Sequence, residues 1–214
     1  EGTLEMMGKA GGGGWGGRDG AALAAGEFWR VGADTGETGP IGIASGDNGF
    51  LQASGHEQRL QPGDVLHVEL IPKVKHYSAR LMRPFIVGEI SAQRAELAQQ
   101  LIALQDEQFK AMKPGVSARE VDAIVREGLL RNGLRADYPN ITGYALGLYT
   151  RTPRPSDFSC SFHAKAEWLL EEDMVFHMYT SAQSLAFSET VRVTPQGAER
   201  LTILPRQLLS LPEH

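Results

Sequence analysis

Alternating apolar and polar residues mark five stretches of the chain as β-strands, because successive side chains of a strand point to opposite faces. These stretches are residues 63–70 (GDVLHVEL), 76–88 (HYSARLMRPFIVG), 143–150 (GYALGLYT), 173–180 (DMVFHMYT) and 186–194 (AFSETVRVT). A short segment, PKVK, separates the first two, and AQSL separates the last two. The pattern therefore predicts two hairpins and one further strand.

Two helices are predicted between the hairpins. Residues 91–112 carry apolar side chains at helical spacing, and a Pro-Gly turn follows them. Ser117 and Glu120 then have the spacing of a capping box at the start of a second helix, and Gly133 suits its C-cap. The predicted order is thus helix, turn, helix and strands.

An internal repeat is indicated when the sequence is offset by 101 positions. Residues 9–32 then align with residues 110–133, and seven of the 24 pairs are identical. Two helix-then-hairpin halves predict an α+β domain over residues 1–214, with a mostly antiparallel sheet and helices on one face. A chance likeness between two helical hairpins is the alternative.

Composition narrows the class of protein. A net charge of −5 and a pI near 5.7 argue against a nucleic-acid partner, which selects for a basic surface. No apolar run approaches the roughly 18 residues of a membrane span, so no membrane partner is expected. A single cysteine, Cys160, fits a reducing compartment, and we expect a cytoplasmic protein. Because the chain begins at Glu1 rather than Met, we expect it to be part of a longer polypeptide.

Charged residues interrupt both predicted hairpins. A simple turn at PKVK would place Glu69 opposite Arg80, and a turn at AQSL would make Tyr179 a neighbour of Glu189. In strand 173–180 the side chains of His177 and Tyr179 share one face, and the apolar face opposite should pack on the helices. We therefore expect a common pocket lined by Glu69, Arg80, Tyr144, His177, Tyr179 and Glu189.

Several segments resemble one known family. They are SGDN at 45–48, LQPGDVL at 60–66, KPG at 113–115, GYALGL at 143–148, MVF at 174–176 and SETVRVTPQGAERLT at 188–202, together with Tyr77 and Arg83. In this order they are similar to the pita-bread fold of the creatinase, aminopeptidase P and methionine aminopeptidase family, from about residue 18 to 205. Members of the creatinase and aminopeptidase P type also carry an N-terminal domain, and we expect the given sequence to be without it.

The resemblance implies a metal site that this chain has altered. Metal-dependent members bind two divalent ions through two Asp, one His and two Glu. Carried over, these positions fall on Glu69, Arg80, Tyr144, Tyr179 and Glu189, so two carboxylates remain. A guanidinium cannot deprotonate, and about 4 Å from a dication it would repel the ion by several kcal/mol. We therefore expect no metal ion and no cofactor.

The hairpin at 67–85 resembles the creatinase branch, and the strand with Tyr144 resembles ectoine hydrolase; both relatives work without metal. The resemblance implies hydrolysis of a non-peptide C–N bond in a small amino-acid derivative. Arg80 and Tyr179 would bind the substrate carboxylate, Glu69 or Glu189 would act as base or nucleophile, and His177 or Tyr144 would pass the proton. A homodimer of the full-length protein is expected.

Two other functions stay open on the sequence alone. A pita-bread domain can be a binding module without catalysis, in which case Glu69 and Arg80 form only a buried ion pair and His177 is a core residue. A metal-dependent Xaa-Pro dipeptidase or aminopeptidase is the third interpretation. A convergent set of polar groups in the pocket favours an enzyme, whereas apolar filling favours a module.

Overall fold

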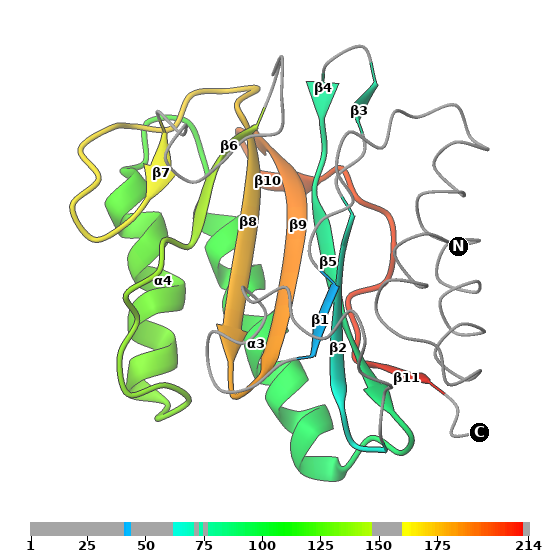
Figure 1. Ribbon diagram of the computed structural model, residues 1–214. Helices are drawn as coiled ribbons and strands as arrows, with labels where there is room; N and C mark the ends of the chain where they lie inside the picture. The colour runs from blue at the N-terminus through cyan, green and yellow to red at the C-terminus, as the bar shows by residue number, and fades with distance from the viewer. Residues whose placement is uncertain (1–40, 44–61, 71–72, 75–76, 147–159, 212–214) are drawn as a thin grey trace.

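The fold is built around one large sheet with helices on one side. A computed structural model describes residues 41–43, 62–70, 73–74, 77–146 and 160–211 (Figure 1). Within these residues the sheet has nine strands, with the order β1-β2-β5-β9-β8-β6-β7, while β10 pairs with β9 and β11 pairs with β5. Every pairing in it is antiparallel except that of β11 with β5. The α+β class with a mostly antiparallel sheet is therefore confirmed.

The five predicted strand segments correspond to β2, β4 with β5, β6, β8 and β9, while β1, β3, β7, β10 and β11 were not predicted. The strands are β1 Ile41–Ile43, β2 Val65–Leu70, β3 Lys73–Val74, β4 Tyr77–Ser78, β5 Leu81–Val87, β6 Gly143–Leu146, β7 Ser161–Phe162, β8 Val175–Ala182, β9 Leu185–Thr194, β10 Gly197–Arg200 and β11 Leu209–Leu211. The helices in the described part of the chain are α3 Ala92–Ala111 and α4 Ala118–Arg131. Strands β3 and β4 form a separate two-stranded sheet beyond the ends of β2 and β5. The first copy of the proposed repeat, residues 9–32, lies outside the described residues.

Helix α4 ends as predicted and begins at the predicted N-cap residue, but without the predicted side-chain bond. Gly133 has a φ of 65°, and its N–H and that of Leu134 donate to the carbonyls of Leu130 and Leu129. This pair of bonds is a Schellman motif, which requires a left-handed residue that glycine adopts without strain. At the start, Ser117 is the N-cap, but its side chain makes no capping hydrogen bond. The expected capping box is therefore not formed.

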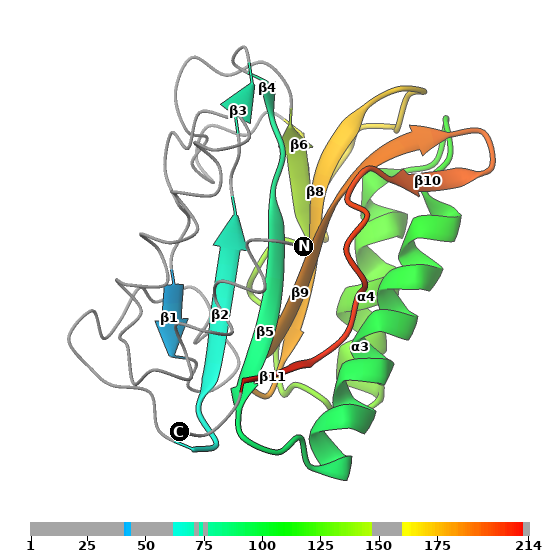
Figure 2. The same ribbon diagram turned by 90° about the vertical axis from the view of Figure 1, so that its right-hand side faces the viewer.

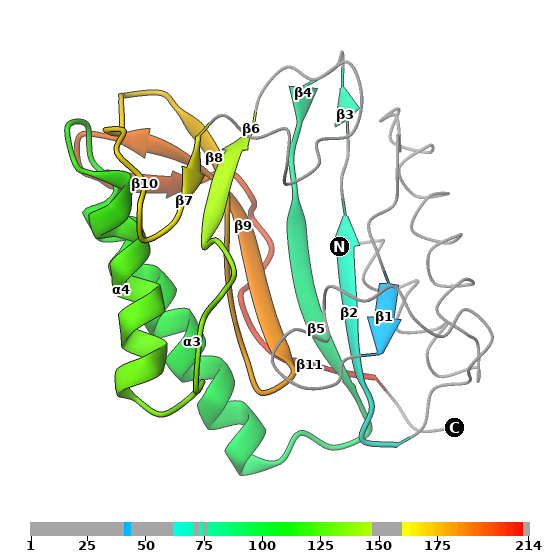
Figure 3. The same cartoon turned by 60° about the vertical axis from the view of Figure 1, so that its left-hand side comes forward.

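Both helices cover the same face of the sheet, as the views in Figures 2 and 3 show. One reason is the alternation along β8, where Phe176 and Met178 are fully buried. They belong to a hydrophobic cluster with Phe109, Met112 and Val121 from α3, its C-cap and α4. The predicted apolar face of strand 173–180 therefore packs on the helices, which leaves the opposite face for His177 and Tyr179.

None of the helices in the described part of the chain is long and apolar enough to cross a membrane. Helix α3 reaches 20 residues, but it carries charged and amide side chains along its length, including Glu96, Asp106 and Lys110. Its buried residues include Leu101 and Phe109 on the side facing the sheet. It is therefore a surface helix with one packed side.

Candidate active site

Three ring side chains meet on the sheet face opposite the helices. Tyr144 of β6 is the cross-strand partner of His177 on β8, and their ring centroids lie 5.0 Å apart. Tyr179, two residues further along β8, has its ring centroid 5.6 Å from that of His177 and 6.4 Å from that of Tyr144. All three side chains are buried. We call these three residues, with Arg80, the aromatic–arginine cluster.

Arg80 joins the cluster from the segment between β4 and β5. Its backbone is held against β9, because its N–H donates to Thr190 Oγ1 over 2.8 Å and its carbonyl accepts from the same hydroxyl over 2.8 Å. The guanidinium carbon lies 5.5 Å from the centroid of the Tyr144 ring, within the range of a cation–π contact. The structure thus brings together four of the six residues that the sequence directed to one pocket.

The charge of Arg80 acts on His177. Burial of the imidazole, together with the positive charge of Arg80, lowers the pKa of His177 well below 6.5. Both effects disfavour a second positive charge at this point. His177 is therefore neutral near pH 7, and it is a weaker base than an ordinary histidine.

The expectation that Glu69 faces Arg80 is wrong. Glu69 on β2 pairs with Met82, and Leu70 pairs with Leu81. The cause is the short β3–β4 extension, where Val74 faces Tyr77, so the hairpin turns one position later than PKVK suggests. The described structure includes the backbone of Glu69 but not its side chain, so its role stays a prediction.

The expectation that Tyr179 and Glu189 are cross-strand neighbours is also wrong. Tyr179 pairs with Ser188, whereas Glu189 pairs with Met178 on the helix-covered face. The reason is a two-residue turn at Gln183 and Ser184, both with positive φ, 46° and 69°. Positive φ at both central positions defines a type I′ turn, and a register shift of one residue moves a side chain to the other face.

Glu189 is instead the centre of a buried ionic network on the helix-covered face of the sheet. Its Oε1 lies 2.6 Å from Nη2 of Arg83, 3.5 Å from Nη1 of Arg200 and 3.8 Å from Nε of Arg206. The hydroxyl of Thr202 donates to Oε2. The carboxylate is fully buried and directed away from the aromatic–arginine cluster. Its catalytic role stays a prediction that this geometry does not favour.

Ser188 is the residue that the sequence analysis missed. It faces the same side as Tyr179 and is the only described β9 residue that pairs with β5, through Met82. Its hydroxyl is buried and has no hydrogen-bond partner among the residues that the structure describes. Alternation along β9 could have identified it only if the turn register had been known, because Gln183 and Ser184 lack the Asn-Gly signal of such turns.

The fold and the position of this cluster define a pita-bread domain, and comparison with known proteins identifies its family. The model of metallopeptidase family M24 matches residues 15–195, and the chain belongs to that family. The Xaa-Pro dipeptidase of Pyrococcus furiosus is 28% identical over 174 residues, which cover 78% of this chain and 48% of that protein. A probable dipeptidase, PepE, of Mycobacterium tuberculosis is 31% identical over 108 residues, which cover 50% of this chain and 29% of PepE.

Solved structures share the fold. The prolidase from Pyrococcus furiosus superposes with a TM-score of 0.75 at 25% identity, over 89% of this chain and 56% of that one. The X-Pro aminopeptidase from Thermotoga maritima gives a TM-score of 0.79 at 22% identity, over 97% and 59%. A methionine aminopeptidase from Thermotoga maritima gives 0.71 at 16% identity, over 94% and 91%. The chain spans about half the length of the curated dipeptidase from Pyrococcus furiosus.

The described residues do not fit the metal that the family name implies. The positions expected to hold it include a cation, Arg80, packed on the ring of Tyr144. Within the described ranges no three His, Cys, Asp or Glu side chains are grouped so that they could hold an ion. Glu189 is already bound by Arg83 and Thr202 on the other face. Hard divalent ions need several converging oxygen or imidazole ligands, and this cluster lacks them.

Proposed function

We propose that this M24 domain hydrolyses a short amide with a free carboxylate, and that it does so without the paired metals of its family. The observation that carries the proposal is the position of Arg80, 5.5 Å from the Tyr144 ring centroid and close enough to lower the pKa of His177. A guanidinium in place of metal ligands changes the preferred ligand from a cation to an anion. The same cluster supplies a neutral base.

Arg80 would anchor the substrate carboxylate. Arginine presents paired N–H donors whose spacing matches the two oxygens of a carboxylate. Its side chain is only half-buried, so a ligand can reach it, and its backbone is fixed on both sides by Thr190. The Tyr144 ring would hold the guanidinium plane in place before the ligand arrives.

His177 would transfer a proton from the attacking water to the leaving nitrogen. As water forms a C–O bond with the amide carbon, the neutral imidazole would accept a proton from the water. The protonated imidazole would then return a proton to the nitrogen as the C–N bond breaks, giving a carboxylic acid and an amine. The positive charge of Arg80, which disfavours the imidazolium, would promote this return.

Xaa-Pro dipeptides are the first substrates to test. The relatives named above are called dipeptidases, prolidases and X-Pro aminopeptidases, and such names favour a peptide over the non-peptide C–N bond expected from the sequence. A dipeptide with a free C-terminus carries the carboxylate that Arg80 would bind. The substrate expected from the sequence, a small non-peptide derivative with a carboxylate, is the second class to test under the same proposal.

A non-catalytic binding module is the second candidate. The observation in its favour is the apolar character of the site face. There a buried hydrophobic group is formed by Met82, Tyr144, Leu146, Tyr179 and Ala186. Such packing would serve recognition of a ligand without chemistry. Under this alternative Arg80 would still bind a carboxylate, but no bond would be cleaved.

One experiment separates these functions. The purified protein would be incubated with Xaa-Pro dipeptides and matched amino-acid amides, with a chelator or with added Mn²⁺, Co²⁺ or Zn²⁺, while its metal content is measured. Cleavage that persists in chelator and is lost in His177→Gln, but not in His163→Gln, supports the proposal. Binding without cleavage supports the module. Cleavage only with stoichiometric metal contradicts both.

A further inference from the structure

The hydroxyl of Ser188 lies on the site face of the sheet with its hydrogen-bonding capacity unused. Ser188 is fully buried, and its Oγ has no hydrogen-bond partner in the part of the chain that the structure describes. Buried polar groups are nearly always hydrogen-bonded, and an unpaired one lowers stability. An unpaired hydroxyl on the face that carries the candidate site is therefore a group that a ligand can complete.

Strand pairing places Ser188 next to the two residues that would bind the substrate and move its proton. Ser188 pairs with Tyr179 on β8. In the neighbouring row of the same face, Thr190 pairs with His177, and its hydroxyl is bonded to the backbone of Arg80. Ser188 is thus a diagonal neighbour of His177, and diagonal residues lie about 7–8 Å apart. A ligand held between Arg80 and His177 can contact Ser188 as well.

Ser188 is held in place by its backbone while its hydroxyl stays available. Nη1 of Arg83 donates to the carbonyl of Ser188 over 2.9 Å, and this guanidinium is itself buried. The neighbouring hydroxyl, Thr190 Oγ1, is already engaged, because it accepts from the N–H of Arg80 and donates to its carbonyl. A donor that is fixed before the ligand arrives is what stabilisation of a developing charge requires.

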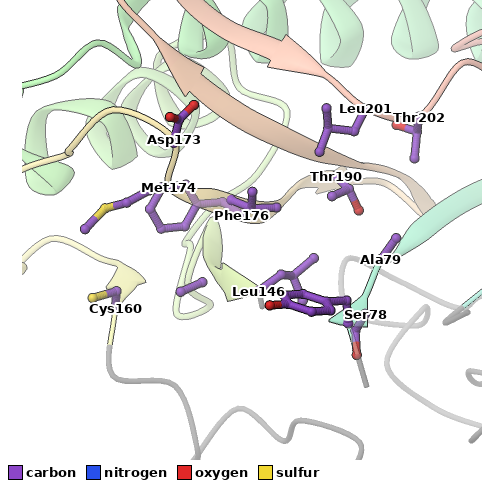
Figure 4. A pocket seen from close by; sticks show the side chains of 13 residues that line it. Ser78, Ala79, Leu146, Cys160, Asp173, Met174, Phe176, Thr190, Leu201 and Thr202 are labelled. Atoms are coloured by element: carbon purple, nitrogen blue, oxygen red, sulfur yellow. The ribbon is translucent and has the colours of Figure 1, made fainter. Parts of the chain in front are cut away.

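A cavity of about 510 Å³ brings a ligand close to this point of the sheet. Figure 4 shows Thr190 in its wall, opposite Ala79. Thr190 is two residues from Ser188 on the same side of β9, a distance of about 6.8 Å. Beside Ser188 on β5 is Met82, whose unbranched side chain can change its rotamer and admit a ligand. Access to the Ser188 hydroxyl therefore requires only local movement.

We propose that the Ser188 hydroxyl donates a hydrogen bond to the carbonyl oxygen of the amide that is cleaved. This inference rests on the proposed function for the reaction itself. As water bonds to the amide carbon, one electron pair of the C=O bond moves to the carbonyl oxygen. When the C–N bond breaks, that pair returns, and the nitrogen receives its proton from His177. Ser188 keeps its own proton throughout, so it stabilises the negative charge on the oxygen without exchanging atoms.

Steady-state kinetics of Ser188→Ala and Thr180→Val with an Xaa-Pro dipeptide test this role. Thr180 is the matched control, because its buried Oγ1 likewise lacks a partner within the described ranges, but it pairs with Phe187 on the helix-covered face. We expect kcat to fall about 100-fold in Ser188→Ala with little change in KM, and to stay at the wild-type value in Thr180→Val. Neither change removes a hydrogen bond, so urea denaturation should show no loss of stability. A lower kcat that comes with a destabilised Ser188→Ala protein would overturn the inference.

A ligand without the carbonyl oxygen separates this inference from the proposed function. N-(2-aminoethyl)proline is Gly-Pro with the carbonyl replaced by a methylene, and it keeps the carboxylate for Arg80. By calorimetry in His177→Gln protein, Ser188→Ala should weaken Gly-Pro about three- to tenfold and leave the methylene analogue unchanged. If this difference is found but the wild type cleaves nothing, the contact stands and the proposed function fails. If the wild type and Ser188→Ala cleave equally well, the inference is overturned while the proposed function stands. Absence of both binding and cleavage overturns both.

Discussion

Nη2 of Arg83 lies 2.6 Å from Oε1 of Glu189, and both side chains are buried. Arg83 also donates to the carbonyls of Met82 and Ser188, the one residue pair through which β5 and β9 are in register. Its remaining donors reach the carbonyls of residues 204 and 205 in the C-terminal segment. The ion pair therefore joins the two halves of the sheet directly beneath the candidate site.

Replacing Glu189 by Gln should lower the free energy of unfolding rather than impair a catalytic step. The change leaves the Arg83 guanidinium buried without its counter-charge, and burial already lowers the pKa of Arg83, although Glu189 acts in the opposite sense. Removing one partner of a buried pair costs about 3–5 kcal/mol. Urea denaturation should show a loss of this order in the free energy of unfolding.

Glu199→Gln is the matched control for that change. Glu199 Oε2 lies 2.6 Å from Nη2 of Arg192, the same separation, but both side chains are well exposed. Exposed pairs contribute little to stability because water and salt screen their attraction. Equal losses for Glu189→Gln and Glu199→Gln would contradict the structural role, and so would lost turnover in a Glu189→Gln protein that is still fully folded.

Residue patterns predicted both described helices, the longer strands β2, β5, β6, β8 and β9, and the faces of β8, but neither the short strands nor the register of either hairpin. Hydrophobic alternation placed Phe176 and Met178 against the helices because it depends only on local sequence. The register of β8 with β9 depends on Gln183 and Ser184 both adopting positive φ, which neither residue type indicates. The contacts of Glu189 with Arg83 and Arg206 join distant segments, and no local pattern encodes them.

His67 should make the protein less stable in mild acid. Burial lowers the pKa of His67 to about 3, whereas an unfolded histidine has a pKa near 6.5. Between these values the unfolded state binds a proton that the folded state does not, so stability falls as the pH falls from about 6.5 towards 3. At pH 4.5 this residue alone should contribute a loss of roughly 2–3 kcal/mol.

Urea denaturation at pH 7, 6, 5 and 4.5 measures this effect through its slope. His67→Gln should flatten the dependence of unfolding free energy on pH, whatever its effect on stability at pH 7. The same replacement at the partly exposed His163 is the control and should leave the slope as in the wild type. Parallel slopes for the wild type and His67→Gln would show that His67 does not titrate in this way.

Arg80→Gln should raise the pKa of His177. Burial is the larger cause of the lowered value and would remain, so the pKa should rise but stay below 6.5. NMR titration of the imidazole Cε1–H signals, assigned with His177→Gln, would measure it. Arg119→Gln on the exposed side of α4 is the charge-matched control and should leave the titration unchanged. An unchanged pKa in Arg80→Gln would show that the guanidinium does not act on this ring.

The same substitution should weaken carboxylate binding. Hydrogen bonds to charged groups contribute about 1.5–3 kcal/mol, so loss of the Arg80 anchor should raise the Kd of a dipeptide about 10- to 100-fold. Calorimetry with Gly-Pro, whose N-terminal residue has no side chain, measures this contribution by itself. A Kd within twofold of the wild type would remove Arg80 from the binding site, irrespective of the His177 titration.

Gly143→Ala should disturb the site through its backbone. Gly143 is the first residue of β6, and a Cβ there would lie 2.8 Å from the carbonyl oxygen of His177 and 2.3 Å from Sδ of Met178. The Met178 side chain can move, but the carbonyl belongs to the neighbouring strand. Strand β6 must therefore shift from β8, and overpacking of this kind costs about 1–3 kcal/mol. Because Tyr144 is the next residue, its contact with the His177 ring should change as well.

Gly128→Ala provides the contrast that identifies the cause. A Cβ at Gly128 would lie 2.5 Å from Cδ2 of Leu104, which is the end of a flexible side chain, and alanine favours a helix over glycine by about 1 kcal/mol. We expect near wild-type stability for Gly128→Ala and a clear loss for Gly143→Ala in urea denaturation. NMR spectra of Gly143→Ala should also show shifted Tyr144 and His177 ring signals, which Gly128→Ala should leave in place. Equal stability of the two variants, with unshifted ring signals, would mean that the close approach of β6 to β8 does not hold the cluster together.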